Sequence, residues 1–539
     1  MPLIDRIQGT IHNLGATAES LAKILLWSRR PSPADLKEDE KRDLVIIANG
    51  PSLNRTVAEH RSFLKDKALM AVNFCAVSPM FTDLRPEMYI IADPLFWIVP
   101  DKCESLFGAL GAKTSWPMRL FMPVKAKGKA NWQKLIAGNP NIRVVWYNTT
   151  PIEGFRWFTD MVYSKGIGMP RPHNVLIPAI ATALRMPFRT IYLAGADHSW
   201  LPEIRVTEDN EVLMHQKHFY DAGSSKADTV KREDLSEARL HIILYHMHVA
   251  FKAYHILEDY ARRHNKRIVN ITPGSYIDAF ERYHIPDEGR DGIVIQARTG
   301  STRLPAKILK PFAPDGSTIL DIIIEKAKRS CPDAVIVLAT TDRPADDVLV
   351  EVAKRHGIEC FRGSEQDVLS RFIGAADRFG LGRIIRVCSD NPFLDTDSFN
   401  TLFDVQSRTG ADYVGFGFPD GRPTIKSHLG LFAELARTAA LRRLNEKSHD
   451  KMDHEHVTIG LYTRPDDYRI SLIPLPDHLK DRTDIRLTLD TPSDFELLHE
   501  LYERHRKEEE PSTRSLIELV DSDPRYGSIM KQNIAQNEK

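Results

Sequence analysis

The chain has 539 residues, more than one ordinary hydrophobic core organises, so we expect two or three domains. Lysine plus arginine and aspartate plus glutamate balance at 73 each, which excludes a general binder of nucleic acid or anionic membranes. The five cysteines are scattered and include no CxxC pair, which excludes a disulfide framework and a cysteine zinc site and indicates a reducing compartment. Any positively charged site must therefore be local.

The first segment, residues 1–30, carries apolar side chains at helical spacing and predicts an amphipathic helix. One interpretation places this helix peripherally on the inner face of a membrane or on a partner. The other packs it on its own domain or on a sister subunit of a homo-oligomer. No apolar run is long enough for a membrane span and the N-terminus has no signal-peptide pattern, so we expect a cytoplasmic protein. The apolar positions are Ile4, Ile7, Ile11, Leu14, Leu21, Ile24, Leu25 and Trp27.

A charged, proline-bearing linker follows this helix, and residues 1–41 form the N-terminal helix and linker. The next domain opens with an apolar run, 44–48, that ends in the turn Asn49-Gly50-Pro51-Ser52. Gly50 permits close backbone approach, and Ser52 can offer its hydroxyl to a phosphate.

Later apolar runs of this half also end in polar residues, namely Asn73, Asp93, Asn148 and Asp197. The carboxyl ends of parallel strands line the ligand crevice of an open α/β sheet. We therefore expect these residues near one edge of a sheet.

The same half carries a group of histidines. A helical metal pair needs histidines four residues apart, whereas three of these are seven apart and form a single stripe. We therefore expect most of them to pack and form hydrogen bonds rather than bind a metal. The group comprises His198, His215, His218, His241, His246, His248 and His255.

The segments IIANGPSLN and IYLAGADHSW, with the loop at Asn73, resemble small bacterial sialyltransferases that use CMP-sugars. They also resemble the related domain of flagellin-glycosylating accessory proteins and of a pterin diphosphokinase. The resemblance spans residues 42–285. It implies a nucleotide surrounded by Asn49, Gly50, Ser52 and Asn73, with Asp197 at the same crevice. Transfer to a hydroxyl also needs a general base, for which His246, His198 and His218 are the candidates.

The C-terminal half opens with a buried-strand pattern at 293–295 that runs into the loop QARTGSTRLPAK. Gly300, Ser301 and Thr302 keep the backbone open, so its N–H groups can approach phosphate oxygens. Positive charge around them comes from Arg298, Arg303 and Lys307. The alternative is an ordinary strand-to-helix turn with a solvated basic rim.

Strand and helix patterns then alternate, which predicts a parallel sheet wound with helices. One predicted strand ends at Asp390, and a second acidic segment, RLTLDTPSD, places Asp490 far along the chain. Mg²⁺ takes one or two carboxylates together with phosphate oxygens and water, so Asp390 is a candidate ligand and a second carboxylate should come from far along the chain. That Asp490 is this second ligand is what the family resemblance described next implies. Read alone, each aspartate could instead be a helix N-cap or a turn residue.

The loop resembles the QAR-x-GSTRLP-x-K signature of the spore-coat polysaccharide cytidylyltransferases, relatives of the enzymes that make CMP-KDO and CMP-sialic acid. Ala306 stands where that family usually has glycine. The resemblance continues in RGS-x-x-DVLxR, RLT-x-DTP-x-D and EHVT. It implies that the second motif lines the nucleotide or sugar pocket and that EHVT closes over the sugar. The residues involved are Arg362, Asp367, Arg371, Glu455 and His456.

These resemblances imply an α/β protein with two Rossmann-like three-layer domains, at 42–285 and 290–506, followed by a polar tail at 507–539. The second domain would have the nucleotide-diphospho-sugar transferase (GT-A-like) fold. It would transfer CMP from CTP to an acidic sugar with Mg²⁺ as cofactor. The first domain would pass the sugar to a glycan or lipid-linked acceptor, or would be a diphosphokinase-like enzyme or a non-catalytic docking module.

Overall fold

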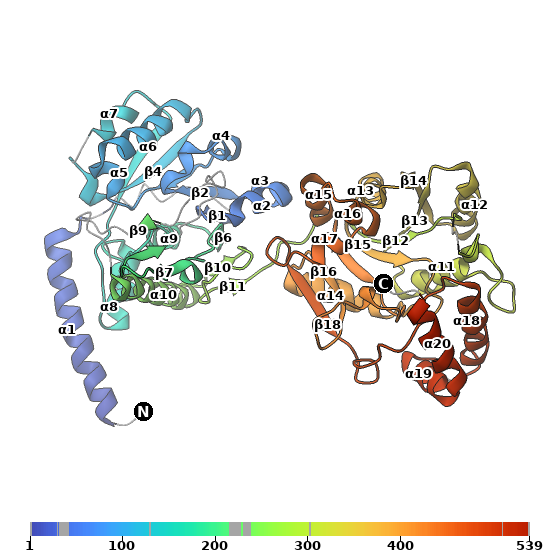
Figure 1. Cartoon of the computed structure of the whole chain (residues 1–539). Coiled ribbons are helices and arrows are strands. Elements are labelled where there is room, and N and C mark those ends of the chain that lie inside the picture. The colour runs from blue at the N-terminus through green and yellow to red at the C-terminus, as the bar shows by residue number, and fades with distance from the viewer. Residues whose placement is uncertain are drawn as a thin grey trace. The chain divides into compact units, whose positions relative to one another are not determined.

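The computed structural model describes residues 3–29, 31, 43–128, 131–214, 228–229, 239–300, 303–508 and 510–536. It divides into two compact units, Met1–Ile285 and Pro286–Lys539, which are described separately (Figure 1). Both units are α/β, and each is built on its own sheet.

The N-terminal unit contains an eight-stranded sheet whose neighbouring strands are all parallel. Its order is β11-β10-β6-β1-β2-β3-β4-β5, so chain order reverses direction between β1 and β6. A small antiparallel sheet stands apart from it. The strands of the large sheet are β1 (Leu44–Ile47), β2 (Ala68–Val72), β3 (Met88–Ile90), β4 (Met118–Pro123), β5 (Ile142–Tyr147), β6 (Thr190–Ala194), β10 (Arg267–Asn270) and β11 (Glu281–Arg282), and those of the small sheet are β7 (Ile204–Val206), β8 (Val212–Met214) and β9 (Asp228–Thr229).

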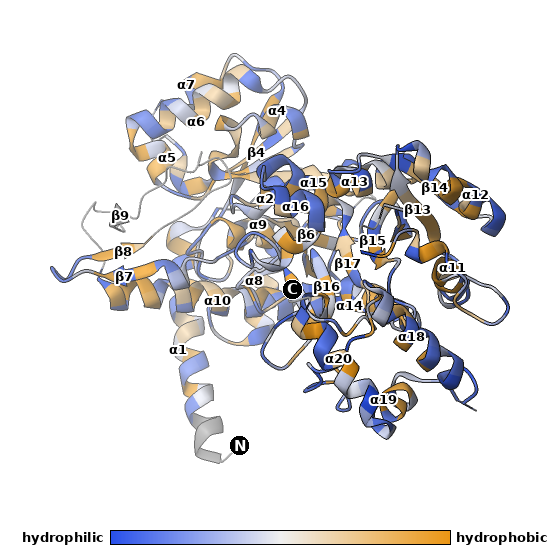
Figure 2. Ribbon diagram, turned by 45° about the vertical axis from the view of Figure 1, so that its right-hand side comes forward, coloured by the Kyte–Doolittle hydropathy of each residue, from blue (hydrophilic) through white to orange (hydrophobic). Residues whose placement is uncertain are grey.

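Helices cover both faces of this sheet, because successive side chains of a fully buried strand point to opposite sides. Leu44 and Ile46 of β1 pack into one core, while Val45 and Ile47 pack into the other. Hydrophobic and hydrophilic colours alternate along α6 and α7, as in amphipathic helices (Figure 2). The first core includes α8 (Arg156–Lys165), α9 (Leu176–Ala183) and α10 (Leu240–Arg263), and the second includes α2 (Ser52–Glu59), α3 (Arg61–Lys65), α5 (Leu95–Ile98), α6 (Pro100–Lys113) and α7 (Trp132–Ile136), with α4 (Met80–Leu84) beside it.

The C-terminal unit contains a seven-stranded sheet of order β14-β13-β12-β15-β17-β16-β18. All neighbours are parallel except β17, which runs antiparallel to β15 and to β16. As a result β16 runs in the same direction as β15. The strands are β12 (Arg290–Gln296), β13 (Val335–Thr341), β14 (Glu359–Gly363), β15 (Leu381–Cys388), β16 (Tyr413–Gly417), β17 (Glu434–Arg437) and β18 (Ile470–Pro474).

Helices also cover both faces of the second sheet, since Ile293 and Ile295 of β12 face one core and Val294 faces the other. The first core is the larger of the two. It holds α11 (Ile319–Ser330), α12 (Asp347–His356), α14 (Ser398–Thr409) and α18 (Pro492–His505). The other core holds α13 (Val368–Phe379), α15 (Thr438–Lys447) and α17 (Ile459–Tyr462), and α16 (Lys451–His456) lies against α13.

Two packed helices stand where the sequence predicted a polar tail. They are α19 (Thr513–Ser522) and α20 (Pro524–Gln536), and Ser512 caps the first with a capping box. Leu516 and Met530 are buried in the same core as α18. In the sequence, polar residues outnumber the residues of the short apolar stripes of these helices. The stripes can therefore be recognised only from the way the helices pack in the structure.

The N-terminal helix α1 (Leu3–Trp27) attaches to its own unit through small hydroxyl side chains. Ser20 donates to the Glu153 carbonyl at 2.8 Å, and Thr17 accepts from the Phe155 amide at 3.0 Å. This contact agrees with the interpretation in which the helix packs on its own domain. None of the helices in the described part of the chain combines the length and the apolar character that crossing a bilayer requires.

The segment after α1 is held by one buried side chain, Asn148, at the end of β5. Its amide oxygen accepts from the Arg29 N–H at 2.8 Å, and its amide nitrogen donates to the carbonyls of Arg29 (2.7 Å) and Gly166 (2.8 Å). Asn148 thus pairs with both backbone groups of one residue, as a neighbouring strand would. It fixes α1 to the sheet.

We predict that Asn148→Ala lowers the free energy of unfolding by about 1–3 kcal/mol, because buried partners lose their hydrogen bonds. Chemical denaturation measures the change, and limited proteolysis should cut near residue 29 faster than in the parent. Asn131→Ala is the matched control, since Asn131 is exposed and its side chain makes no capping bond. Equal stability of the two variants would contradict the proposed anchoring.

Candidate active site

Five loops of the C-terminal unit meet at one edge of its sheet. They follow strands that run in the same direction, so their carboxyl ends lie together, which is where open α/β sheets bind ligands. The loops are 297–306 after β12, 342–346 after β13, 364–367 after β14, 389–397 after β15 and 418–426 after β16.

Lys307 stands at the centre of this edge. Its ammonium lies 3.3 Å from Asp390 Oδ2 and 3.3 Å from Asp490 Oδ1, and it also donates to the Leu489 carbonyl. The Leu489 N–H in turn donates to the Asp390 carbonyl at 2.9 Å. The structure therefore brings together the two aspartates that the sequence singled out, with the loop lysine between them.

A second layer of charge holds Asp490 in place. Arg486 is almost fully buried and donates to Asp490 Oδ2 at 3.1 Å and to both oxygens of Asp494 at 2.8 Å. Burial alone would raise the pKa of Asp490, but Lys307, Arg303 and Arg486 outweigh it and leave that pKa below its usual value. Asp490 is therefore a carboxylate at neutral pH.

The donor set around Lys307 suits Mg²⁺. Two carboxylates and the Leu489 carbonyl supply only oxygen atoms, the ligands that this hard cation prefers. The ammonium already shows that one cation can contact both carboxylates. Groups of three or more metal-binding side chains are absent from the described residues, so phosphate oxygens and water would have to complete the coordination.

The basic loop after β12 is anchored by a residue that the sequence did not reveal, Asp346. This buried carboxylate accepts from the Thr299 N–H at 2.7 Å, from the Thr299 hydroxyl at 2.6 Å and from the Thr341 hydroxyl. Burial would raise the pKa of Asp346, but these hydrogen bonds lower it below its usual value. A ThrxxxxAsp pair after β13 was the available signal, and it is too common to be specific.

Other predicted loop residues lie around this anchor. Arg298 is 3.8 Å from Glu365 and Arg303 is 3.7 Å from Asp490, distances longer than hydrogen bonds. A side chain at Gly300 would lie 2.9 Å from the end of the flexible Arg343 side chain, which would have to move to make room. Ser301 and Thr302 lie outside the described residues.

Ala306 adopts φ 52° and ψ 28°, in the left-handed region. Glycine enters this region without strain, which explains why the resembling signature usually has glycine here.

The two arginines of the RGS-x-x-DVLxR motif differ in exposure, but both donate to backbone carbonyls. Arg371 is buried and donates to the Ser364 carbonyl at 2.9 Å, while Arg362 donates to the carbonyls of Thr341 and Arg343. Both arginines therefore shape the loops. Burial lowers the pKa of Arg371, and the positive charge of Arg298 adds to this effect.

Asp367 is the N-cap of α13 and accepts from the Ser370 N–H at 2.9 Å, while Ser364 accepts from the Asp367 N–H at 3.0 Å. Asp367 also contacts His454 at 2.9 Å, and this hydrogen bond raises the pKa of His454. The contact ties the EHVT segment to the second motif.

The EHVT segment contains a strained turn. Val457 has φ 59° and ψ −56°, and the Thr458 N–H donates to the His456 carbonyl at 2.6 Å, which defines a γ-turn. A positive φ at a β-branched residue is an outlier that costs about 1–3 kcal/mol. The Thr458 hydroxyl donates to buried Glu434 at 2.6 Å and holds the turn closed, while Glu455 and His456 remain exposed.

In the N-terminal unit, the predicted residues after β1 and β6 also meet. Ser52 donates to Asp197 through its hydroxyl (2.8 Å) and its N–H (3.2 Å), and the Gly50 N–H donates to the Gly195 carbonyl at 2.8 Å. A side chain at Gly50 would collide with Asp197. Burial raises the pKa of Asp197, against the lowering effect of the Ser52 hydrogen bonds. This pair lies at the point where the strand order reverses.

Asn49 and Asn73 flank this pair in the chain. The Asn49 side-chain oxygen is buried without a hydrogen-bond partner in the described part of the chain. Asn73 adopts φ 42°, and its side chain accepts from the Ala92 N–H at 3.3 Å. Asn73 therefore organises the β3 loop, whereas Asn49 keeps an unused acceptor.

The three candidate bases differ in their surroundings. His198 is buried, shares a 2.6 Å hydrogen bond with the Tyr254 hydroxyl, and burial lowers its pKa to about 3. His246 is exposed on α10 and stacks on His173, with ring centres 4.7 Å apart. His218 lies outside the described residues. Of the two described candidates, His246 is the accessible one.

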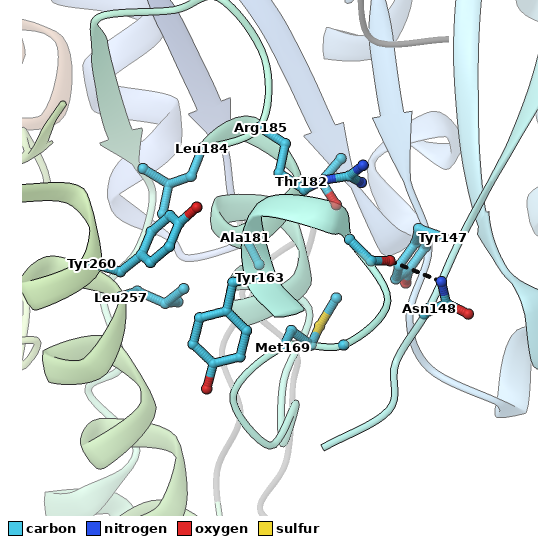
Figure 3. A pocket seen from close by; sticks show the side chains of 12 residues that line it. Tyr147, Asn148, Tyr163, Met169, Ala181, Thr182, Leu184, Arg185, Leu257 and Tyr260 are labelled. Carbon is cyan, nitrogen blue, oxygen red and sulfur yellow. Dashed lines mark hydrogen bonds between the residues drawn. The ribbon is translucent and has the colours of Figure 1, made fainter. Parts of the chain in front are cut away.

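A pocket with an empty volume of about 370 Å³ opens elsewhere in the N-terminal unit (Figure 3). Of the strand-end residues expected at a ligand crevice, Asn148 lines it, whereas none of the predicted nucleotide-binding or catalytic residues does. Its walls come from β5, α8, α9 and α10, and we assign it no part in the chemistry. The lining residues are Tyr147, Asn148, Tyr163, Gly166, Gly168, Met169, Ala181, Thr182, Leu184, Arg185, Leu257 and Tyr260.

Known proteins match the C-terminal unit. A family model described as cytidylyltransferase matches residues 293–513. An uncharacterised protein of Methanocaldococcus jannaschii is 33% identical over 243 residues, which cover 45% of this chain and 95% of that protein. The spore coat polysaccharide biosynthesis protein SpsF of Bacillus subtilis is 30% identical over 236 residues, 43% of this chain and 94% of that protein. The 3-deoxy-manno-octulosonate cytidylyltransferase of Koribacter versatilis is 32% identical over 114 residues, 21% of this chain and 41% of that protein.

The matched region contains the basic loop, both aspartates and the segments that hold them. Two of the relatives align along nearly their whole length at 30% identity or more. Through its C-terminal unit, the chain belongs to the cytidylyltransferase family.

Proposed function

We propose that the C-terminal unit transfers CMP from CTP to a hydroxyl of an acidic sugar of the ulosonic-acid type. The hydroxyl oxygen forms a bond to the α-phosphorus while the bond to the bridging β-phosphate oxygen breaks. Pyrophosphate leaves with that electron pair, and the hydroxyl proton passes to water. The observation that carries the proposal is the Lys307–Asp390–Asp490 cluster beside the glycine-bearing loop.

The loop cations hold the triphosphate in this scheme. Arg298 lies 3.8 Å from Glu365 and Arg303 lies 3.7 Å from Asp490, so both guanidinium groups bring positive charge to the loop beside the two aspartates. The Lys307 ammonium contacts three oxygen atoms, which hold its positive charge in a fixed position between Asp390 and Asp490. Positioning and fixed positive charge suffice for phosphoryl chemistry, so no protein nucleophile is required.

Asp390 and Asp490 would hold Mg²⁺ in the proposed complex. The bound ion supplies neutralisation of the charge that develops on the phosphate oxygens. The two carboxylates then also keep Lys307 directed toward the same region.

The preference for an acidic sugar has support from Lys426, which follows β16 at the same edge. No carboxylate of the described residues lies within ion-pair distance of Lys426, and its ammonium is 5.9 Å from the centre of the Tyr462 ring. Nearby Arg422 pairs with Asp420 at 3.6 Å and stacks on Phe418. Lys426 is therefore the cation of this loop that can meet a sugar carboxylate, the group that a 3-deoxy-manno-octulosonate also carries.

A second function is favoured by the Ser52–Asp197 pair and the unused acceptor of Asn49. These groups lie at the reversal point of a parallel sheet, where nucleotides bind in such folds. We propose that the N-terminal unit uses the CMP-sugar as donor for a glycan or lipid-linked acceptor, with His246 as the base. A diphosphokinase-like enzyme or a docking module remains the alternative.

Asp390→Asn should lower the rate of pyrophosphate release from CTP by about 100-fold or more. The reason is that the proposed Mg²⁺ site loses one of its two carboxylates, and with it the positive charge held at the phosphates. A coupled phosphate assay with a panel of acidic sugars measures the effect. Asp466→Asn, at an exposed position, is the matched control. If the Asp390 variant keeps full activity, the assignment of the site is wrong.

Lys426→Gln should raise the KM for the acidic sugar about 10-fold or more and leave the KM for CTP unchanged, since a charge-assisted contact to carboxylate is lost. Lys531→Gln on exposed α20 is the control. A rise in the KM for CTP alone would place Lys426 at the nucleotide instead.

Transfer is tested in the full chain carrying Asp390→Asn, supplied with preformed CMP-sugar. We expect CMP release only when an acceptor is present, and loss of that release on further substitution of Asp197 by Asn. Absence of turnover with every CMP-sugar would favour a docking module. Loss of transfer in Asp390→Asn alone would show that the two units are not independent.

A further inference from the structure

The N-terminal helix α1 has two distinct sides. One side is attached to its own unit through Thr17, Ser20 and the residues that follow them on the same face. An adjoining stripe of the same helix carries large apolar side chains that remain largely exposed. Exposed fractions are 64% for Ile11, 57% for Leu14, 47% for Leu21 and 82% for Leu25.

The exposed side chains follow a strict heptad. Ile11, Leu14, Ala18, Leu21 and Leu25 are spaced alternately by three and four residues, and all five are exposed. The sequence continues the same spacing backward to Ile7 and Ile4. A three-heptad run of this kind is the seam of a coiled coil, narrower than the face by which a helix packs on a globular core.

The pattern identifies the kind of partner. Among the described seam residues, isoleucine at one first core position (Ile11) and leucine at both second core positions (Leu14, Leu21) form the combination that favours two strands, although leucine also occupies a first core position at residue 25. In the sequence the positions flanking the seam carry no charge, so two identical copies meet without like-charge repulsion. A seam that repeats along one helix is complementary to itself.

A lipid surface fits this helix less well. Helices that lie on membranes are rich in Lys and Arg on the polar side. The 25 residues of α1 hold two acidic and two basic side chains, and Lys23 already pairs with Glu19 at 2.6 Å. A neutral polar side offers no attraction to anionic headgroups.

We propose that α1 pairs with α1 of a second copy of the chain in a two-stranded coiled coil. In this dimer each helix keeps its contacts to its own unit through Thr17 and Ser20. The heptad residues of the two helices pack against each other and join the two chains. The proposal concerns assembly and does not depend on the function of either unit.

Sedimentation velocity of the full chain tests it. The parent should sediment with twice the 61.3 kDa of one chain, and Ile11→Glu/Leu14→Glu should be monomeric, with a dissociation constant raised at least about 100-fold. His12→Glu, off the seam on the same helix, and Ile98→Glu, equally exposed at 63% on α5, are the matched controls. A monomeric parent, or a double variant that still dimerises, overturns the proposal.

A gain-of-function variant removes misfolding as an explanation. Ala18→Leu fills the one small core position of the described seam and should tighten dimerisation about 10-fold. Unchanged or weaker association of this variant counts against the seam. The parent is also floated with vesicles of phosphatidylcholine and phosphatidylglycerol, and we expect it to stay unbound. Flotation that Ile11→Glu/Leu14→Glu abolishes would assign the same side chains to a lipid surface.

Discussion

The ammonium of Lys307 between Asp390 and Asp490 is the contact on which the C-terminal site depends. Its three participants are 83 and 183 residues apart in sequence, and each arrives from a different loop. The contact holds only because the segment before Asp490 lies along the end of β15, where the Leu489 N–H meets the Asp390 carbonyl. A charged cluster of this kind is favourable when every member has a partner, and costly when one is missing.

Buried polar groups keep the surrounding loops in position. Asp346 ties the basic loop after β12 to the end of β13, and Arg486 ties Asp490 to the first turn of α18 through Asp494. Glu434 receives hydrogen bonds from Arg386, Tyr413 and Thr458. Each network satisfies charges that burial would otherwise penalise. Because its hydrogen bonds are directional, each network also holds its loop in one conformation.

Sequence reasoning did not predict β4, β16, β17 or β18, and it paired Asp490 with Asp390 only through the family resemblance. It did predict most of the other strands and the edge where their loops meet. These features follow from local patterns, because a buried strand is a short apolar run and its polar end residue follows at once. It did not predict Asp346, the His454 contact or the strained turn at Val457, whose roles depend on partners that are distant in sequence. It also placed Arg371 at the nucleotide, whereas the structure buries that side chain beneath a loop carbonyl. The sequence indicated a tail that begins as a helix and then frays, but the packing of α19 and α20 was missed for the same reason, since their core is contributed by α18 and by the sheet.

The charges of the cluster cancel. Lys307, Arg303 and Arg486 face Asp390, Asp490 and Asp494, so the formal sum of the six side chains is zero. A nucleotide approaching through solvent therefore meets little long-range field, and electrostatic steering contributes little to its association rate. Recognition begins at contact, when phosphate oxygens compete with carboxylates for the same N–H donors. Added salt should then affect the rate of nucleotide capture far less than it would for a bare cationic loop.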